Sequence, residues 1–164
     1  VAGYLHDLGK LVIDQSILEK PAGLNEYEIS KMRSHTYYTY QLLNNIPQFD
    51  EIKKWAAYHH EKLNGNGYPF HLKGGEIPFG SRIMAVADIF TAITEDRPYR
   101  IGMRYENAVK LLRNMVDDGS LDGNIINILI EHYHEINNQR IEVQEKAAVR
   151  YSSFFNSELV HQLT

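Results

Sequence analysis

Imidazole and carboxylate side chains, the groups with which proteins most often bind transition metals, occur at separate places along this chain. The most unusual stretch is AAYHHEKLNGNGYPF (residues 56–70), in which the adjacent His59 and His60 precede a Gly-Asn-Gly-Tyr-Pro turn. Two glycines and a proline hold the chain open directly beyond the histidine pair. Four predicted helical segments together carry six candidate ligands, which are His6, Asp7, His35, His59, His60 and Asp88.

Each candidate ligand has an ordinary alternative explanation when it is taken alone. A lone histidine such as His35 is more often a surface or hydrogen-bonded residue than a ligand. Asp88 is harder to explain in this way, because it interrupts the apolar run IMAVADIFTAI and a buried carboxylate must be paired or bound to a metal. The chain has no cysteine, so any metal must bind to imidazole and carboxylate, a donor set that suits iron, manganese, nickel or zinc.

The composition is that of one globular domain without a membrane span. The 164 residues are 43% hydrophobic and 23% charged, and no apolar run reaches the ~18 residues that a span needs. A net charge of −4 argues against a surface for a DNA or RNA polymer, although a local basic pocket can still bind one phosphate group. No secretion leader opens the chain, so we expect a cytoplasmic protein. The helical pattern is already in progress at Val1, and we therefore expect further sequence upstream.

Helical periodicity along almost the whole chain predicts one all-α domain. We expect a first helix that Gly9 stops, and a helix that runs from an Asn25–Glu28 capping box to about Asn45. A third helix should bury Trp55 and end at the histidine pair. Further helices are predicted at residues 78–94, at 105–119 and, as one long helix, at 122–151.

The order and spacing of four blocks resemble the HD-GYP family, which are bacterial metal-dependent phosphodiesterases of the HD superfamily that degrade cyclic di-GMP. The blocks are HDLGK (residues 6–10), His35, HHEKLNGNGYP (59–69) and DIFTAITEDRPYR (88–100). The resemblance runs from about residue 2 to residue 123 and includes ILEKPAGL and GSLDG. It implies an HD-superfamily helical bundle that lacks its first helix or helices here, within a single domain over 1–164 that ends in a helical extension from about 124.

Carried over to this sequence, the resemblance implies that His6 and Asp7 form the HD pair and that Asp7 bridges two divalent transition-metal ions. One ion would be bound by Asp7 and three histidines, which are His35, His59 and His60. The other ion would be bound by His6, Asp7 and Asp88. Iron or manganese is expected first, with nickel or zinc as alternatives.

The resemblance also implies substrate contacts. Lys10 would meet a phosphate and, with Asp7, take part in catalysis. Tyr68 would contact the guanine or ribose, and Arg97 and Arg100 would hold phosphate oxygens with their guanidinium groups. A solvated surface side chain is the alternative reading for Lys10 and for Arg100.

The chain departs from the family pattern in three ways. The upstream helix that carries a further histidine or glutamate is absent, so the ion bound by His6, Asp7 and Asp88 should be the weaker of the two. Thr91 stands where a second aspartate is usual, and Thr39 stands where a glycine is usual. Thr91 removes a negative charge from the cleft, whereas Thr39 suggests only altered packing.

The expected function is hydrolysis of cyclic di-GMP to pGpG, with GMP as a further product left open. One alternative is hydrolysis of a related cyclic dinucleotide. Another is a cyclic dinucleotide receptor or protein-docking module with weakened catalysis, which Thr91 and the missing upstream helix favour. A sensor or receiver domain often precedes such a module, and the protein could form a homodimer. The sequence reveals neither the upstream domain nor the oligomeric state.

Overall fold

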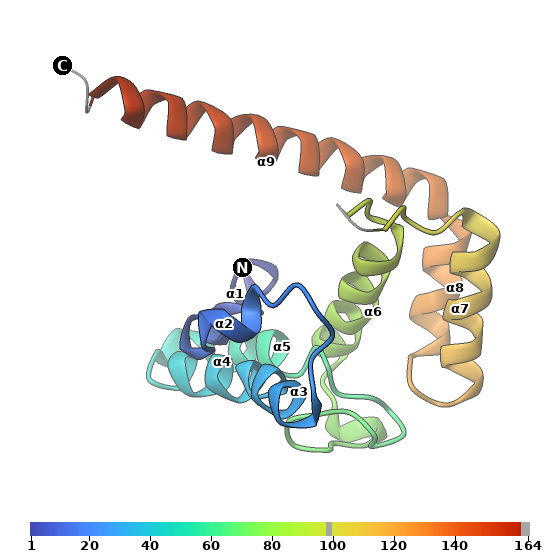
Figure 1. The fold of residues 1–164 in the computed structure, drawn as a ribbon. Coiled ribbons are helices and arrows are strands. Elements are labelled where there is room, and N and C mark those ends of the chain that lie inside the picture. Colours follow the sequence, from blue (N-terminus) through green and yellow to red (C-terminus); the bar gives the residue numbers. More distant parts are fainter. Residues whose placement is uncertain (98–99, 162–164) are drawn as a thin grey trace. The chain divides into compact units, whose positions relative to one another are not determined.

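The computed structural model describes residues 1–97 and 100–161, and side chains as far as Phe154. Its described part consists of helices, connecting loops and two isolated β-bridges, which confirms the all-α prediction (Figure 1). The elements are α1 (Ala2–Leu5), η1 (Leu8–Val12), α2 (Gln15–Leu18), α3 (Glu26–Arg33), α4 (His35–Asn44), η2 (Pro47–Phe49), α5 (Asp50–Ala57), η3 (Gly74–Glu76), α6 (Phe79–Thr94), α7 (Tyr105–Asp117), α8 (Gly123–Glu131) and α9 (Tyr133–His161).

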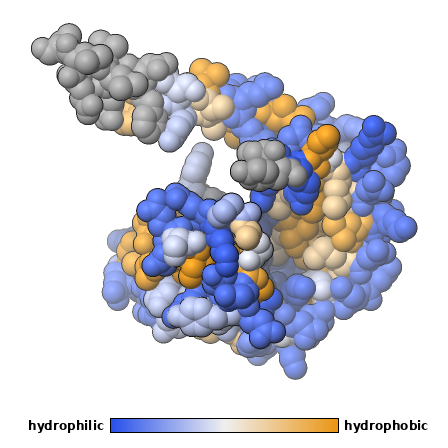
Figure 2. Space-filling view, in the orientation of Figure 1, coloured by the Kyte–Doolittle hydropathy of each residue, from blue (hydrophilic) through white to orange (hydrophobic). Residues whose placement is uncertain are grey.

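Two compact units make up the chain, Val1–Ile126 and the part that begins at Asn127. All the candidate site residues lie in the first unit. The surface in Figure 2 is mostly hydrophilic, with smaller hydrophobic areas between the polar side chains. No helix within the described residues is both long and apolar enough to cross a bilayer.

Five helical elements form the core beneath the candidate site. In this core α4 packs against both η1 and α5, while α5 also contacts α1 and α6. Ala2, Leu43 and Ala56 are its buried centre, and side chains such as Leu8 and Met84 pack around them. Because small residues from α1 and α5 meet there, the backbones approach closely and bring the ends of different helices together.

The capping box at Asn25 is present, but the helix that it opens is shorter than predicted. Asn25 accepts a hydrogen bond from the Glu28 backbone N–H, and Glu28 accepts one from the Asn25 N–H. The prediction of one helix to Asn45 is wrong, because α3 ends at Arg33 and α4 begins at His35. Three consecutive side chains compete there for the carbonyls that a continuous helix would use. The bonds are Ser34 to the Lys31 carbonyl, His35 to the Met32 carbonyl and Thr36 to the Arg33 carbonyl.

Gly9 and Trp55 have different roles from those predicted. The first helix ends at Leu5, before Gly9, and Gly9 lies buried in η1. A Cβ atom on Gly9 would lie 1.9 Å from the His35 carbonyl oxygen, so the glycine permits close packing rather than stopping a helix. Trp55 is 37% exposed and lies against Gly80 at the start of α6, whereas Lys53 is buried on the same helix.

The long C-terminal helix is predicted in the right region but is interrupted. Instead of one helix over 122–151, α8 ends at Glu131 and α9 runs from Tyr133 to His161. His132 forms the turn between them, and its ring lies 3.5 Å from the Glu135 carboxylate in the first turn of α9.

Candidate metal centre

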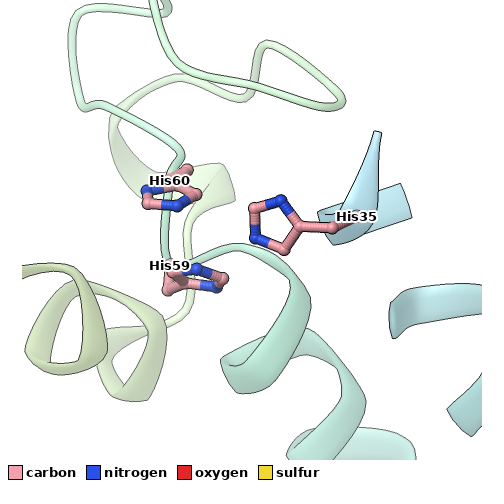
Figure 3. Close-up of side chains that lie close together, drawn as sticks. All are labelled: His35, His59 and His60. Atoms are coloured by element: carbon pink, nitrogen blue, oxygen red, sulfur yellow. The ribbon is translucent and has the colours of Figure 1, made fainter. Parts of the chain in front are cut away.

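The structure brings all six predicted metal ligands into one cluster. His6 and Asp7 lie in the turn between α1 and η1, and His35 is the first residue of α4. His59 and His60 follow the end of α5, and Figure 3 shows their rings beside that of His35, which reaches toward them from α4. The sixth residue, Asp88, lies within α6 and completes the group.

The two oxygens of the Asp7 carboxylate face different histidines. Asp7 Oδ2 lies 3.4 Å from His6 Nε2, and Asp7 Oδ1 lies 3.3 Å from His35 Nε2. The Asp88 carboxylate approaches the cluster from the opposite helix, with its oxygens 3.9 Å from His6 Nε2 and 3.9 Å from His60 Nδ1. Because its two oxygens face different histidines, the Asp7 carboxylate is suited to bridging two cations.

Three of the four histidines are held in the same way. Each ring hydrogen-bonds through Nδ1 to the carbonyl three residues earlier, at the end of a helical segment. Since a carbonyl can only accept, Nδ1 carries the proton and the neutral ring presents the Nε2 lone pair outward, as a metal ligand must. The pairs are His6 with Gly3 at 2.8 Å, His35 with Met32 at 2.7 Å and His59 with Ala56 at 2.6 Å.

Two of these Nε2 atoms are buried without a partner. His35 and His59 are each 2% exposed, and their Nε2 atoms form no hydrogen bond within the described residues. A buried polar atom without a partner costs about 1–3 kcal/mol and therefore calls for an explanation. A metal ion would provide the missing partner for both atoms.

Burial keeps the imidazoles neutral. It lowers the pKa of His59 to about 2 and that of His60 to about 4, and neighbouring histidines act in the same direction. Burial also lowers the pKa of His35, although the Met32 carbonyl and Asp7 oppose it. A neutral imidazole at physiological pH is the form that binds metal.

The pKa values of the two carboxylates are shifted in opposite directions. Burial raises the pKa of Asp88 above its ordinary value. Burial also acts to raise the pKa of Asp7, but the hydrogen bond from Lys10 and the positive charge near the carboxylate outweigh it, so the net shift is downward. Asp7 is therefore held in its ionised, ligating form.

Two ligand groups can be distinguished within the cluster. The ligand atoms of His35, His59 and His60 all lie within 4.8 Å of one another, and so do those of His6, Asp7 and His59. The first group contains three of the four residues expected for one ion, without Asp7. In the second group His59 lies closer to His6 and Asp7 than the sequence suggested, and Asp88 lies at its edge.

Two of the predicted substrate residues, Lys10 and Tyr68, contact this cluster, whereas the two arginines have other partners. Lys10 Nζ donates to Asp7 Oδ2 at 2.6 Å, and the Tyr68 ring lies 4.9 Å from the His60 ring. The two arginines lie past the α6 helix, on either side of residues 98–99, which fall outside the described part. Arg97 Nε lies 3.6 Å from the Glu95 carboxylate, and Arg100 donates a hydrogen bond to the Ala92 carbonyl.

Glu61 fixes the Gly-Tyr-Pro loop to the histidine pair, a role that sequence reasoning missed. Its carboxylate is 3% exposed and accepts the backbone N–H groups of Phe70 at 2.7 Å and Leu72 at 3.0 Å. The Phe70 ring packs 5.4 Å from the rings of both Tyr40 and Tyr58. The loop is thus held at both its backbone and its side chain before any ligand binds.

Thr39 holds the HD turn against α4, which sequence reasoning also missed. Its hydroxyl accepts the Gly9 N–H at 2.9 Å and donates to the His6 carbonyl at 3.0 Å. Thr39 is fully buried. The residue that departs from the family pattern is therefore a direct tether of the His6–Asp7 pair.

Comparison with known proteins agrees with this geometry. A family model described as HD domain matches residues 1–125. The chain is 36% identical over 132 residues to 3'3'-cGAMP-specific phosphodiesterase 1 of Vibrio cholerae, covering 80% of this chain and 31% of the relative. It is 34% identical over 133 residues to a cyclic di-GMP phosphodiesterase of Pseudomonas aeruginosa, with 80% and 31% covered. It is 40% identical over 114 residues to the cyclic di-GMP phosphodiesterase response regulator RpfG of Xanthomonas campestris, with 68% and 30% covered. The chain thus spans less than a third of these relatives.

Proposed function

Because the chain belongs to the HD domain family, in its HD-GYP branch, we propose that it is the hydrolytic domain of a metal-dependent phosphodiesterase. Its substrate is a 3',3'-cyclic dinucleotide, in the first place cyclic di-GMP, which it opens to pGpG. Relatives named for cyclic di-GMP and for 3'3'-cGAMP support the substrate class. Which of the two is preferred is decided by the experiment below.

One observation supports this proposal most directly. Two buried imidazole nitrogens without a hydrogen bond in the described part of the chain lie beside a carboxylate whose two oxygens face different histidines. The Nε2 atoms of His35 and His59 are buried and form no hydrogen bond among the described residues, and Asp7 presents one oxygen to His35 Nε2 and the other to His6 Nε2. This donor set suits iron, manganese, nickel or zinc. Bound ions would neutralise phosphate charge and acidify a water molecule at neutral pH.

The surrounding residues have separate tasks in such a reaction. Asp7 stays ionised and holds its place through the Thr39 tether on the adjacent backbone. Lys10, whose side chain is 41% exposed beside Asp7, would stabilise the negative charge that builds on the phosphorus oxygens. Tyr68 lies against His60 and would pack on a base or ribose, which orients the phosphodiester toward the cluster.

A receptor without turnover is the second candidate, and Thr91 favours it. With a threonine in place of a carboxylate, weak catalysis with retained binding would follow. Arg97 and Arg100, the residues expected to hold phosphate oxygens, contact Glu95 and the Ala92 carbonyl. Both candidates require these arginines to leave those partners when the ligand binds.

The remaining proposals concern the longer protein. Since one relative is named a response regulator, we propose that a receiver or sensor module regulates this domain. We also propose a cytoplasmic location and a homodimer, neither of which the cluster itself requires.

The test is an incubation of the whole protein, loaded with iron or manganese under anaerobic conditions, with cyclic di-GMP and separately with 3'3'-cGAMP. The expected product from cyclic di-GMP is pGpG, and chelation should abolish its formation. Tight binding without product would favour the receptor. Neither binding nor product with both nucleotides would overturn the proposed function.

A further inference from the structure

Four planar groups contact one another in a row from the buried cluster to the surface. We call this row the stack, although its rings are tilted by 44° (His59 and His60) and 36° (His60 and Tyr68). The ring centroids of His59 and His60 are 4.0 Å apart, and those of His60 and Tyr68 are 4.9 Å apart. The guanidinium carbon of Arg33 then lies 5.2 Å from the centroid of the Tyr68 ring. The stack begins at a side chain that is 2% exposed and ends at an exposed arginine. Arg33 belongs to none of the residues to which a role has been given above.

The helix break at Ser34 sets the position of Arg33. Arg33 is the last residue of α3, and its carbonyl accepts the hydroxyl of Thr36 at 2.9 Å. His35 begins α4 two residues later, and its ring points toward the rings of His59 and His60 in the ligand cluster. The same break therefore directs one side chain to the cluster and another to the Tyr68 ring.

The other cations considered for phosphate binding each have a partner within the described residues. Lys10 pairs with Asp7, and the two distal arginines contact Glu95 and a carbonyl of α6. Arg33 instead lies over a ring face, and no carboxylate of the described residues forms an ion pair with it. No hydrogen bond from its N–H groups is found among the described residues either, and a guanidinium can bind phosphate oxygens in a bidentate manner.

The positive charge of Arg33 also affects the pKa of the Tyr68 hydroxyl. Burial raises the pKa of the Tyr68 hydroxyl to about 12, and the Arg33 charge opposes this shift. The distance of 5.2 Å between the guanidinium carbon and the ring centroid places the cation and the ring in one local environment. A ligand that packs on Tyr68 would therefore come within reach of Arg33.

We propose that Arg33 binds the phosphate of the cyclic dinucleotide that is not being cleaved, at the outer end of the stack. This inference rests on the proposed function, since a cyclic dinucleotide carries two phosphates and the metal cluster would engage one. Tyr68 packs on the nucleoside between them. Arg33 is thus a substrate-binding residue and takes no part in the chemical step.

The experiment compares Arg33→Ala and Arg33→Lys with the wild type. Lys31→Ala is the matched control, because Lys31 lies on the same helix with its Nζ 5.5 Å from the centroid of the Tyr27 ring, away from the cluster. Binding of cyclic di-GMP is measured by calorimetry on metal-depleted whole protein at several salt concentrations, and KM and kcat are measured on the loaded protein. Metal content and melting temperature are recorded for each variant.

We expect Arg33→Ala to weaken binding roughly ten- to hundredfold, as loss of a charge-assisted contact does. KM should rise by a similar factor with little change in kcat, since the contact is made equally before and during the reaction. The dependence of affinity on salt should also become shallower, which a purely structural effect would not cause. Arg33→Lys should be intermediate, and Lys31→Ala should match the wild type.

Unchanged affinity or an unchanged salt dependence in Arg33→Ala would overturn the inference and leave the proposed function intact. A fall in kcat with an unchanged KM would also overturn it. Failure of the wild type itself to bind or hydrolyse any cyclic dinucleotide would overturn the proposed function instead.

Discussion

Replacing Thr39 by valine removes a tether of the HD turn while it preserves side-chain shape. The Thr39 hydroxyl joins the Gly9 N–H and the His6 carbonyl to α4, across 30 and 33 residues of sequence. Valine fills the same volume but offers neither a donor nor an acceptor. We expect Thr39→Val to destabilise the protein and to loosen the His6–Asp7 pair.

The magnitude follows from the two bonds. The Gly9 N–H is buried, and a buried donor without a partner costs about 1–3 kcal/mol. The His6 carbonyl is partly buried, and loss of its bond costs about 0.5–1.5 kcal/mol. The free energy of unfolding should therefore fall by about 2–4 kcal/mol, which lowers the melting temperature by roughly 5–15 °C. Metal affinity should fall about tenfold, as it does when a support of a ligand is removed.

Thermal unfolding and metal titration of the wild type, Thr39→Val and two controls provide the assay. Thr39→Ser keeps the hydroxyl and should retain metal affinity. Ser81→Ala removes an equally buried hydroxyl that donates to the Lys54 carbonyl and not to the HD turn, so metal affinity should stay near the wild-type value. If Thr39→Val binds metal and melts like the wild type, the tether has no energetic role and the reasoning is refuted.

Three further perturbations have defined outcomes. Asp7→Ala should remove both ions and all hydrolysis together, and full metal content in an inactive variant would count against bridging. Glu61→Gln should lose one of the two hydrogen bonds that the carboxylate accepts from the loop backbone. Limited proteolysis should then cut the loop at residues 65–72 faster, while metal content stays constant. Resistance to proteolysis equal to that of the wild type would contradict this prediction. In the metal-free folded protein, the pKa of His59 is about 2 and that of His60 is about 4, both below the ordinary value of 6.5. As pH falls below 6.5, these two imidazoles are therefore protonated in the unfolded chain before they are protonated in the folded protein. Urea unfolding should show stability that falls from pH 6.5 toward pH 4, by up to about 1.4 kcal/mol per pH unit for each group, and a gain on acidification would be contrary to the expectation.

The ligand cluster was predictable because residue type and order carry its chemistry. A histidine pair, an HD dipeptide and a carboxylate in an apolar helix each restrict what the chain can do, and together they predicted residues that the structure brings within ion-pair distance. The Asn25 capping box was likewise readable, since its two hydrogen bonds join residues three apart. Local spacing is sufficient for such features.

Contacts between distant segments were not predictable from spacing. Nothing in the sequence near Thr39 indicates that its hydroxyl meets Gly9, and nothing near Glu61 indicates that it accepts bonds from the far side of the Gly-Tyr-Pro loop. The break at Ser34 depends on three side chains that compete with the helix for carbonyls, so propensity alone predicted a continuous helix. Arg33 received no role for the same reason, because the break determines where its side chain lies.

The most direct measurement is anomalous X-ray scattering from crystals of the protein loaded with iron or manganese, recorded at the absorption edge of the metal. Two peaks on either side of the Asp7 carboxylate are predicted, a strong one beside His35, His59 and His60 and a weaker one toward His6 and Asp88. The absence of any peak at Asp7, or metal bound only elsewhere on the protein, would contradict the proposed metal-dependent phosphodiesterase centre.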